Sequence, residues 1–200
     1  MMRSWLLERV QPALGPDENP MRVLWLSLGI VLADQLIKWL VRSQMYLGQS
    51  IEVLGPIFRL TYTENPGIAF GLRIGDGLWV TFMAIAATLG IGLYLYRVRH
   101  ARLGYRLALA SILGGAVGNL VDRIFYAKWF GYGDYFQGRV VDYLHIDLWR
   151  GEVLGHYVAL WPIFNLADVA IVTGVVTIFV FQKRFFEPHP AQESASRVSS

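Results

Sequence analysis

The chain has 200 residues, of which 54% are hydrophobic, 14% aromatic and only 16% charged, and its formal net charge is +3. This composition is too apolar for an ordinary water-soluble domain, and the length suggests a single domain. The absence of cysteine excludes disulfides, thiol catalysis and cysteine metal sites.

Four apolar segments are predicted as membrane spans, because a span needs roughly 20 apolar residues. Their approximate bounds are 21–41, 77–96, 104–124 and 164–182. The second segment carries no charge, whereas the other three reach this length only by including polar residues at one end. Together they predict one membrane domain at 21–185. Residues 1–20 then form a cytoplasmic N-terminal extension, and the polar residues 186–200 form a disordered cytoplasmic tail.

The distribution of basic residues predicts the orientation. Arg97, Arg99 and Arg102 lie between the second and third segments, Arg106 lies at the start of the third, and Lys183 and Arg184 follow the fourth. By the positive-inside rule both termini face the cytoplasm, so the connections 42–76 and 125–162 face outward.

The two outer connections differ in pattern. The first alternates apolar and polar residues before Asn65-Pro66-Gly67, which predicts a small antiparallel strand pair and a turn. The second is rich in aromatic residues, which is typical of segments at a membrane interface. The sequence therefore predicts an all-α membrane protein with four transmembrane helices, a small extracytoplasmic β-rich cradle and interfacial loop segments.

Polar side chains inside the predicted spans all fall near the outer leaflet. They are Asp34 and Lys38 in the first span, Asn119, Asp122 and Arg123 in the third, and Asn165 and Asp168 in the fourth. A charged side chain at bilayer depth costs roughly 2.5–3.5 kcal/mol even on the lenient insertion scale. Their convergence therefore favours a shared polar site.

Structural roles explain some of these residues. Asp34 and Lys38 are an i,i+4 pair, so an ion pair that positions the first span is as good an interpretation as contact with a ligand. Gly114 and Gly118 form a small-xxx-small pair, which favours helix packing. Asp168 is harder to explain in this way, because a capping residue normally precedes the apolar run of a helix.

Five motifs occur in order along the chain: DQLIKWLV (34–41), ENPGIAFG (64–71), GGAVGNLVDRI (114–124), VVDYL (140–144) and FNLADVAI (164–171). Together they resemble the lipoprotein signal peptidase family, bacterial signal peptidase II, over roughly residues 21–185. The resemblance implies an intramembrane aspartic endopeptidase that cleaves diacylglyceryl-modified prolipoproteins just before the lipid-modified cysteine.

The resemblance also implies a location and a set of partners. The protein is expected in the bacterial inner membrane, multi-pass, with its active site toward the outer leaflet. Expected partners are lipid-modified prolipoproteins and membrane lipids, but no nucleic acid. No metal or cofactor is implied, and the protein is expected to be monomeric.

Topology alone pairs Asp122 with Asp168, since both lie in predicted spans. The family pattern instead assigns the catalytic dyad to Asp142 and Asp168 and makes Asp122 and Arg123 a supporting pair, although these two are also compatible with a simple boundary pair. Residues that match substrate-binding positions of the family are Asn65, Gly118, Asn119, Asp122, Arg123 and Asn165. Asp34 and Lys38 match a motif that holds the first span in place.

The spacing around Asp142 departs from the family pattern, and other functions are compatible with the same residues. The segments between Asp122 and Asp142 and between Asp142 and Asp168 are longer than the family's compact pattern. A proton- or ion-coupled carrier that uses the same carboxylates is the alternative function, and a non-catalytic membrane scaffold is a third. A carrier predicts polar groups near the midplane and repeat symmetry between halves. His145, Asp147 and His156 lack the tight spacing of a metal site and are expected to be solvated.

Overall fold

The computed structural model describes residues 19–69, 72–73, 77–147, 150–153, 156–159 and 163–186. Most of the predicted extension (1–20) and tail (186–200) lies outside these residues. Within the described residues, three helices are long and apolar enough to cross a membrane: Pro20–Gln44, Gly77–Arg97 and Leu103–Trp129. They coincide with the first three predicted spans.

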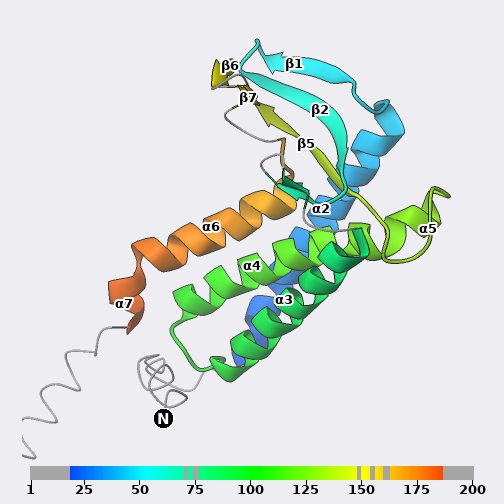
Figure 1. Ribbon diagram of the computed structural model, residues 1–200. Coiled ribbons are helices and arrows are strands. Elements are labelled where there is room, and N and C mark those ends of the chain that lie inside the picture. The colour runs from blue at the N-terminus through cyan, green and yellow to red at the C-terminus, as the bar shows by residue number, and fades with distance from the viewer. Residues whose placement is uncertain are drawn as a thin grey trace, which may run out of the picture.

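Each of these helices is built from one or more elements. The first joins the 3-10 turn η1 (Pro20–Val23) to α2 (Leu24–Gln44), and the second is α3 (Gly77–Arg97). The third runs through α4 (Leu103–Val121), the π-helical turn η2 (Asp122–Tyr126) and α5 (Ala127–Trp129). Helix α4 packs against α2, α3 and the later helix α6 (Figure 1).

The fourth predicted span, 164–182, is helical but shorter than predicted. It forms α6 (Leu166–Val180) of 15 residues, followed after Phe181 by the short α7 (Gln182–Phe186). At about 1.5 Å per residue, α6 is about 22 Å long, against a hydrocarbon core of about 30 Å. The count of four full spans is therefore not confirmed. The predicted length was wrong because a cap at Asn165 starts the helix and Phe181 leaves helical geometry.

A small antiparallel sheet stands at the end of the helices opposite α7 (Figure 1). Its strand order is β1 (Ser50–Leu54), β2 (Phe58–Asn65) and β5 (Val140–Ile146). The β1–β2 pair confirms the predicted strands of the first connection. Two short hairpins, β3 (Ile68–Ala69) with β4 (Leu72–Arg73) and β6 (Arg150–Val153) with β7 (His156–Ala159), complete the strands that the structure describes.

Strand β5 corrects the prediction for the second connection. Residues 140–146 were expected in an interfacial loop segment but pair with β2, with Asn65 opposite Val140 and Thr63 opposite Asp142. Aromatic content did not reveal the strand, because its pairing partner lies almost 80 residues earlier in the chain. This pairing brings the VVDYL motif to the helices.

Small residues let the helices approach closely. A Cβ atom on Gly114 would lie 2.9 Å from the Cα of Ser27, and one on Gly118 would lie 2.7 Å from Oδ2 of Asp34. Both distances are too short for a side chain, so these glycines permit the α2–α4 contact and confirm the packing prediction.

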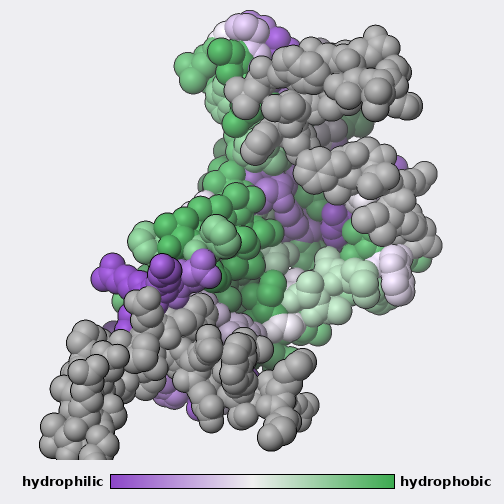
Figure 2. All heavy atoms as spheres, turned by 60° about the vertical axis from the view of Figure 1, so that its left-hand side comes forward, coloured by the Kyte–Doolittle hydropathy of each residue, from purple (hydrophilic) through white to green (hydrophobic). Residues whose placement is uncertain are grey.

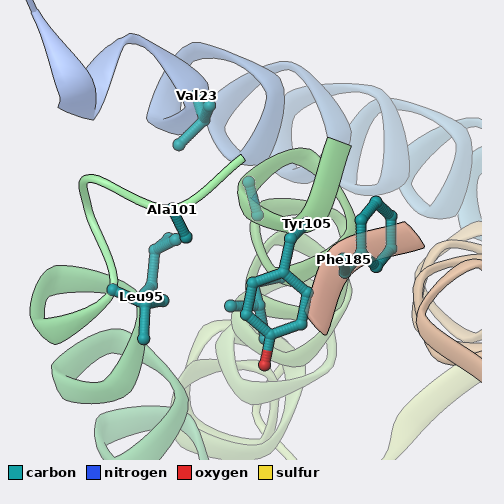
Figure 3. Close-up of a cluster of buried hydrophobic side chains, with 8 residues drawn as sticks. Val23, Leu95, Ala101, Tyr105 and Phe185 are labelled. Atoms are coloured by element: carbon teal, nitrogen blue, oxygen red, sulfur yellow. The ribbon is translucent and has the colours of Figure 1, made fainter. Parts of the chain in front are cut away.

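The far end of the bundle is closed by an apolar cluster. Val23, Leu95, Ala101, Tyr105 and Phe185 are buried there and come from the ends of the helices (Figure 3). The sides of the helices, by contrast, expose large apolar residues, such as Leu93 at 71% and Phe179 at 72%. Figure 2 shows this apolar surface, with hydrophilic residues gathered near α7. Exposed apolar sides are those of helices surrounded by lipid.

Candidate active site

The N-terminus of α6 carries one of the two predicted catalytic residues. Asn165 is the N-cap: its side chain accepts a hydrogen bond from the Asp168 backbone N–H at 3.0 Å, and Oδ2 of Asp168 accepts from the Asn165 N–H at 3.1 Å. This reciprocal capping box satisfies two backbone donors that a helix start leaves open. The expectation that capping does not explain the position of Asp168 was therefore wrong, because the helix begins only at Leu166.

The other predicted catalytic residue, Asp142, lies on β5 and is only 3% exposed. The side-chain Nδ2 of Asn165 donates to its Oδ1 at 2.7 Å. Burial, and then the nearby charge of Asp168, raise the pKa of Asp142 to about 7, against the opposing hydrogen bonds of Asn165 and Asn65. A buried carboxyl with this pKa keeps its proton in about half of the molecules at neutral pH.

A backbone bridge explains why both carboxylates are hydrogen-bonded to Asn165. Leu144, at the end of the VVDYL motif, exchanges hydrogen bonds with Phe164: its N–H donates to the Phe164 carbonyl at 2.7 Å, and the Phe164 N–H donates back at 3.0 Å. The chain thus enters α6 directly from a pairing with β5. This bridge sets Asp142 beside Asn165 although more than 20 residues separate them in sequence.

Asn119 on α4 connects Asp168 to the buried cation of α2. Its Nδ2 donates to Oδ1 of Asp168 at 2.8 Å, while its Oδ1 accepts from Nζ of Lys38 at 2.9 Å and from Nδ2 of Asn165 at 3.1 Å. Since Lys38 only donates and a carboxylate accepts, these partners fix which end of the Asn119 amide faces Asp168. Each predicted amide residue of this region therefore has a defined orientation.

Lys38 forms a buried ionic triad with Asp34 and Asp122. Its Nζ lies 2.8 Å from Oδ2 of each carboxylate, and all three side chains are 0% exposed. The predicted Asp34–Lys38 pair is confirmed. The supporting pair expected of Asp122 and Arg123 stays a prediction, while Asp122 has Lys38 as its ion-pair partner. The reason is tertiary: α2 lies against α4 and presents Lys38 to the end of that helix.

The triad also touches both segments that carry the predicted dyad. Oδ1 of Asp34 accepts from the backbone N–H of Ala167 at 3.1 Å, at the start of α6. Oδ2 of Asp122 accepts from the backbone N–H of Val141 at 3.1 Å, next to Asp142. Two carboxylates of the triad therefore hold the backbone beside each member of the predicted dyad.

Arg123 lies in the π-helical turn η2, a type of helix distortion that is frequent at functional sites. Its charge acts on Asp122, Asp142 and Asp168. In the described part of the chain, its Nη1 is buried and has no hydrogen-bond partner. A buried N–H group without a partner can donate a hydrogen bond to a carbonyl oxygen.

The remaining predicted residues lie at the margins of this network. Asn65 ends β2, where its Oδ1 accepts from the Gly67 N–H at 2.9 Å and its side chain hydrogen-bonds Asp142. Gly118 is buried, where Asp34 and Ala167 approach it. Gln35 was not predicted as a site residue, although it follows Asp34 in the first motif and contacts Asp122.

Solved structures define the general class of this protein. It shares its fold with a bacterial membrane enzyme determined by the in meso method at 1.9 Å resolution, with a TM-score of 0.60, 25% identity and coverage of 79% of this chain and 90% of the other. A second bacterial membrane enzyme, determined at 2.3 Å, shares the fold with a TM-score of 0.62, 22% identity and coverage of 90% and 97%. The fold is thus that of a membrane enzyme.

Sequence comparison then identifies the family. The family model described as signal peptidase (SPase) II matches residues 26–184. The lipoprotein signal peptidase of Chlorobium luteolum is 36% identical over 162 residues, which cover 80% of this chain and 90% of the relative. That of Amoebophilus asiaticus is 38% identical, covering 85% and 82%. The chain belongs to the signal peptidase II family and is a membrane protease.

Proposed function

We propose that this protease removes the signal peptide of diacylglyceryl-modified prolipoproteins by cutting just before the lipid-modified cysteine, with Asp142 and Asp168 as its catalytic dyad. One observation carries the assignment of the dyad. Asn165 donates its side-chain amide to Asp142 and its backbone N–H to Asp168, so a single residue joins the two carboxylates. The curated relatives are named lipoprotein signal peptidases, which supports the substrate class.

The chemistry proposed for the dyad uses one proton on Asp142 and none on Asp168. Asp168 removes a proton from a water molecule as the water oxygen bonds to the scissile carbonyl carbon, and Asp142 gives its proton to the carbonyl oxygen. When the tetrahedral intermediate collapses, the C–N bond breaks. Asp168 then protonates the leaving amine, and Asp142 recovers a proton from the intermediate. One water molecule is consumed, and both carboxyls return to their starting states.

Two donors are proposed to hold the substrate backbone, and Asn119 is proposed to orient Asp168. The first is Nη1 of Arg123, which is buried and has no hydrogen-bond partner among the described residues, and whose guanidinium lies within electrostatic range of Asp142 and Asp168. Asn65 contributes its amide from the end of β2, and Nδ2 of Asn119 donates to Oδ1 of Asp168 and so orients that carboxylate. We assign Gly118 and Asp122 to support of the site, because both are buried in the helix contacts.

The site is proposed to lie at the outer leaflet of the inner membrane. Its residues cluster where α6 begins, whereas Lys183 and Arg184 follow the other end of that helix. The positive-inside rule then puts the start of α6 outward and both termini inside. We propose that α6, despite its length, is the fourth span of a monomeric enzyme. The acyl chains of the substrate rest in lipid while its peptide bond reaches the dyad.

The carrier alternative is not favoured. The chain belongs to a family of peptidases, and the network of carboxylates and amides around Asp142 and Asp168 lies at one end of the helices. A carrier needs a path of polar groups to both sides of the membrane.

The test follows cleavage of a diacylglyceryl-modified precursor by purified enzyme in detergent. Asp142→Asn and Asp168→Asn are each expected to lower turnover by at least roughly 100-fold, since a general acid or base contributes that much or more. The matched control is Asp134→Asn, which changes a carboxylate that is 78% exposed and paired with Lys128 at 3.1 Å. Normal cleavage by Asp142→Asn would refute the dyad, and would favour Asp122 if Asp122→Asn were inactive while folded.

A further inference from the structure

Both the nitrogen and the oxygen of the Gln35 side-chain amide on α2 have hydrogen-bond partners. Its Nε2 donates to Oδ1 of Asp122 at 2.9 Å and to the backbone carbonyl of Gly118 at 3.1 Å, and it lies 3.3 Å from Oδ2 of Asp34. All three partners are acceptors only, so the nitrogen must face them and the oxygen must face the other way.

The oxygen of this amide accepts a hydrogen bond from a tyrosine of the helix formed by α4, η2 and α5. The hydroxyl of Tyr126, a residue that is 4% exposed, donates to Oε1 of Gln35 at 3.0 Å. Tyr126 ends the π-helical turn η2, and Asp122 begins it. Gln35 therefore bridges both ends of the distorted turn, and the Tyr126 hydroxyl holds the amide in the one orientation that serves Asp122.

The two carboxylate oxygens of Asp122 accept from different partners. Gln35 occupies Oδ1, which leaves Oδ2 for Nζ of Lys38 at 2.8 Å and for the backbone N–H of Val141 at 3.1 Å. A carboxylate is two-fold symmetric about its last torsion and that torsion is broad. A donor fixed on one oxygen therefore determines where the other oxygen lies.

The position of the Val141 backbone matters because the catalytic carboxylate follows it directly. Nδ2 of Asn165 contacts both the Val141 carbonyl at 3.3 Å and Oδ1 of Asp142 at 2.7 Å. Strand β5 must therefore be placed accurately along its own direction for the Asn165 amide to reach both the Val141 carbonyl and Asp142. A misplacement of about 1 Å at a catalytic group can cost on the order of 100-fold in rate.

We propose that Gln35, held by Tyr126, is a positioning residue of the reaction: it fixes the carboxylate of Asp122, which holds the backbone N–H of Val141 and so sets the place of Asp142. The inference rests on the proposed dyad. Gln35 touches neither catalytic carboxylate in this structure and acts through Asp122.

The test compares Gln35→Met, Tyr126→Phe and a matched control. Methionine keeps the length of the side chain but removes both donors and the acceptor, and phenylalanine removes only the hydroxyl. The control is Ser27→Ala, which deletes another buried hydrogen bond between α2 and α4, from Ser27 Oγ to the Ala110 carbonyl at 2.7 Å, two turns nearer the other end of α2. Each variant is purified in detergent, and its kcat, KM and Tm are measured with the same modified precursor.

A positioning role predicts a separation of kcat from KM. Gln35→Met is expected to lower kcat by roughly 30- to 100-fold with KM changed by less than about twofold, and Tyr126→Phe to lower kcat by roughly 3- to 10-fold. Ser27→Ala is expected to lower Tm without changing kcat. The alkaline limb of the kcat–pH profile should also move to lower pH in Gln35→Met. Asp142 faces Asp168, Lys38 and Arg123, and a displaced strand exposes its carboxyl to water.

The possible outcomes separate this inference from the proposed function. If wild-type enzyme cleaves but Gln35→Met keeps kcat within about twofold and an unchanged pH profile, the positioning role is refuted. If Gln35→Met does not fold, Tyr126→Phe decides in the same way: kcat and pH profile like those of Ser27→Ala refute the role. If wild-type enzyme does not cleave the precursor, the proposed function fails, and with it the premise of this inference.

Discussion

Asp142 is expected to make the folded protein less stable as the pH rises, and Asp142→Asn should remove this effect. Burial and the charge of Asp168 raise the pKa of this carboxyl from 3.8 to about 7. The folded protein therefore holds the proton more tightly than the unfolded chain does. Stability is lost as the pH rises from about 4 to about 7, the interval in which only the unfolded chain releases the proton, and it stays lower above that interval.

The two pKa values give the size of the effect. The interval from 3.8 to about 7, at about 1.36 kcal/mol for each pH unit, corresponds to about 4 kcal/mol of unfolding free energy. For a chain of this size, 1 kcal/mol shifts Tm by about 2–4 °C, so the full effect is on the order of 10 °C. An asparagine in place of Asp142 keeps a neutral side chain at every pH and an oxygen that accepts from Asn165.

Thermal unfolding in detergent from about pH 4 to about pH 8.5 measures this effect. The Tm of Asp142→Asn minus that of wild type is expected to be near zero at the acid end and to grow by roughly 10 °C toward the alkaline end. Asp134→Asn, on the exposed surface, should show no such growth. A Tm difference that is independent of pH, or one that falls as the pH rises, would show that Asp142 is not a buried carboxyl with a raised pKa.

Three further substitutions test the network around the dyad by thermal unfolding and by cleavage of the precursor. Lys38→Met leaves two buried carboxylates without their cation and should cost about 3–5 kcal/mol; an unchanged Tm would contradict the buried triad. Gly118→Ala places a methyl group 2.7 Å from Oδ2 of Asp34 and should cost about 1–3 kcal/mol, whereas Gly90→Ala, with nothing within 4 Å, should not destabilise. Asp168→Asn keeps only one acceptor oxygen, whereas Asp168 accepts from both the Asn165 N–H and the Asn119 amide, so cleavage should be lost and stability should fall by about 1–3 kcal/mol; a larger loss of stability would point to a mainly structural Asp168.

Local patterns in the sequence were sufficient for the helices and for the contacts within them. Three apolar runs correspond to three helices long enough to cross a membrane, since lipid requires about 20 apolar residues whatever the neighbours are. The i,i+4 spacing of Asp34 and Lys38 was enough to predict their ion pair, because residues four apart lie on one helix face. The family motifs were likewise readable from the chain alone, and the family is confirmed.

The contacts between distant segments were decided by the tertiary structure. Lys38 pairs with Asp122, 84 residues away, only because α2 packs on α4. Asp142 reaches Asn165 because β5 pairs with β2 on one side and with Phe164 on the other, and strand pairing of this kind leaves no periodic signal at the partner's position. The sequence by itself determined the family and the helices apolar enough to cross a membrane, and it supplied the candidate residues of the site. The register of β5, and the buried charges that hold this strand, decided that Asp142 contacts Asn165. Hydrogen bonds and ion pairs between distant segments form only once the fold brings them within about 3 Å.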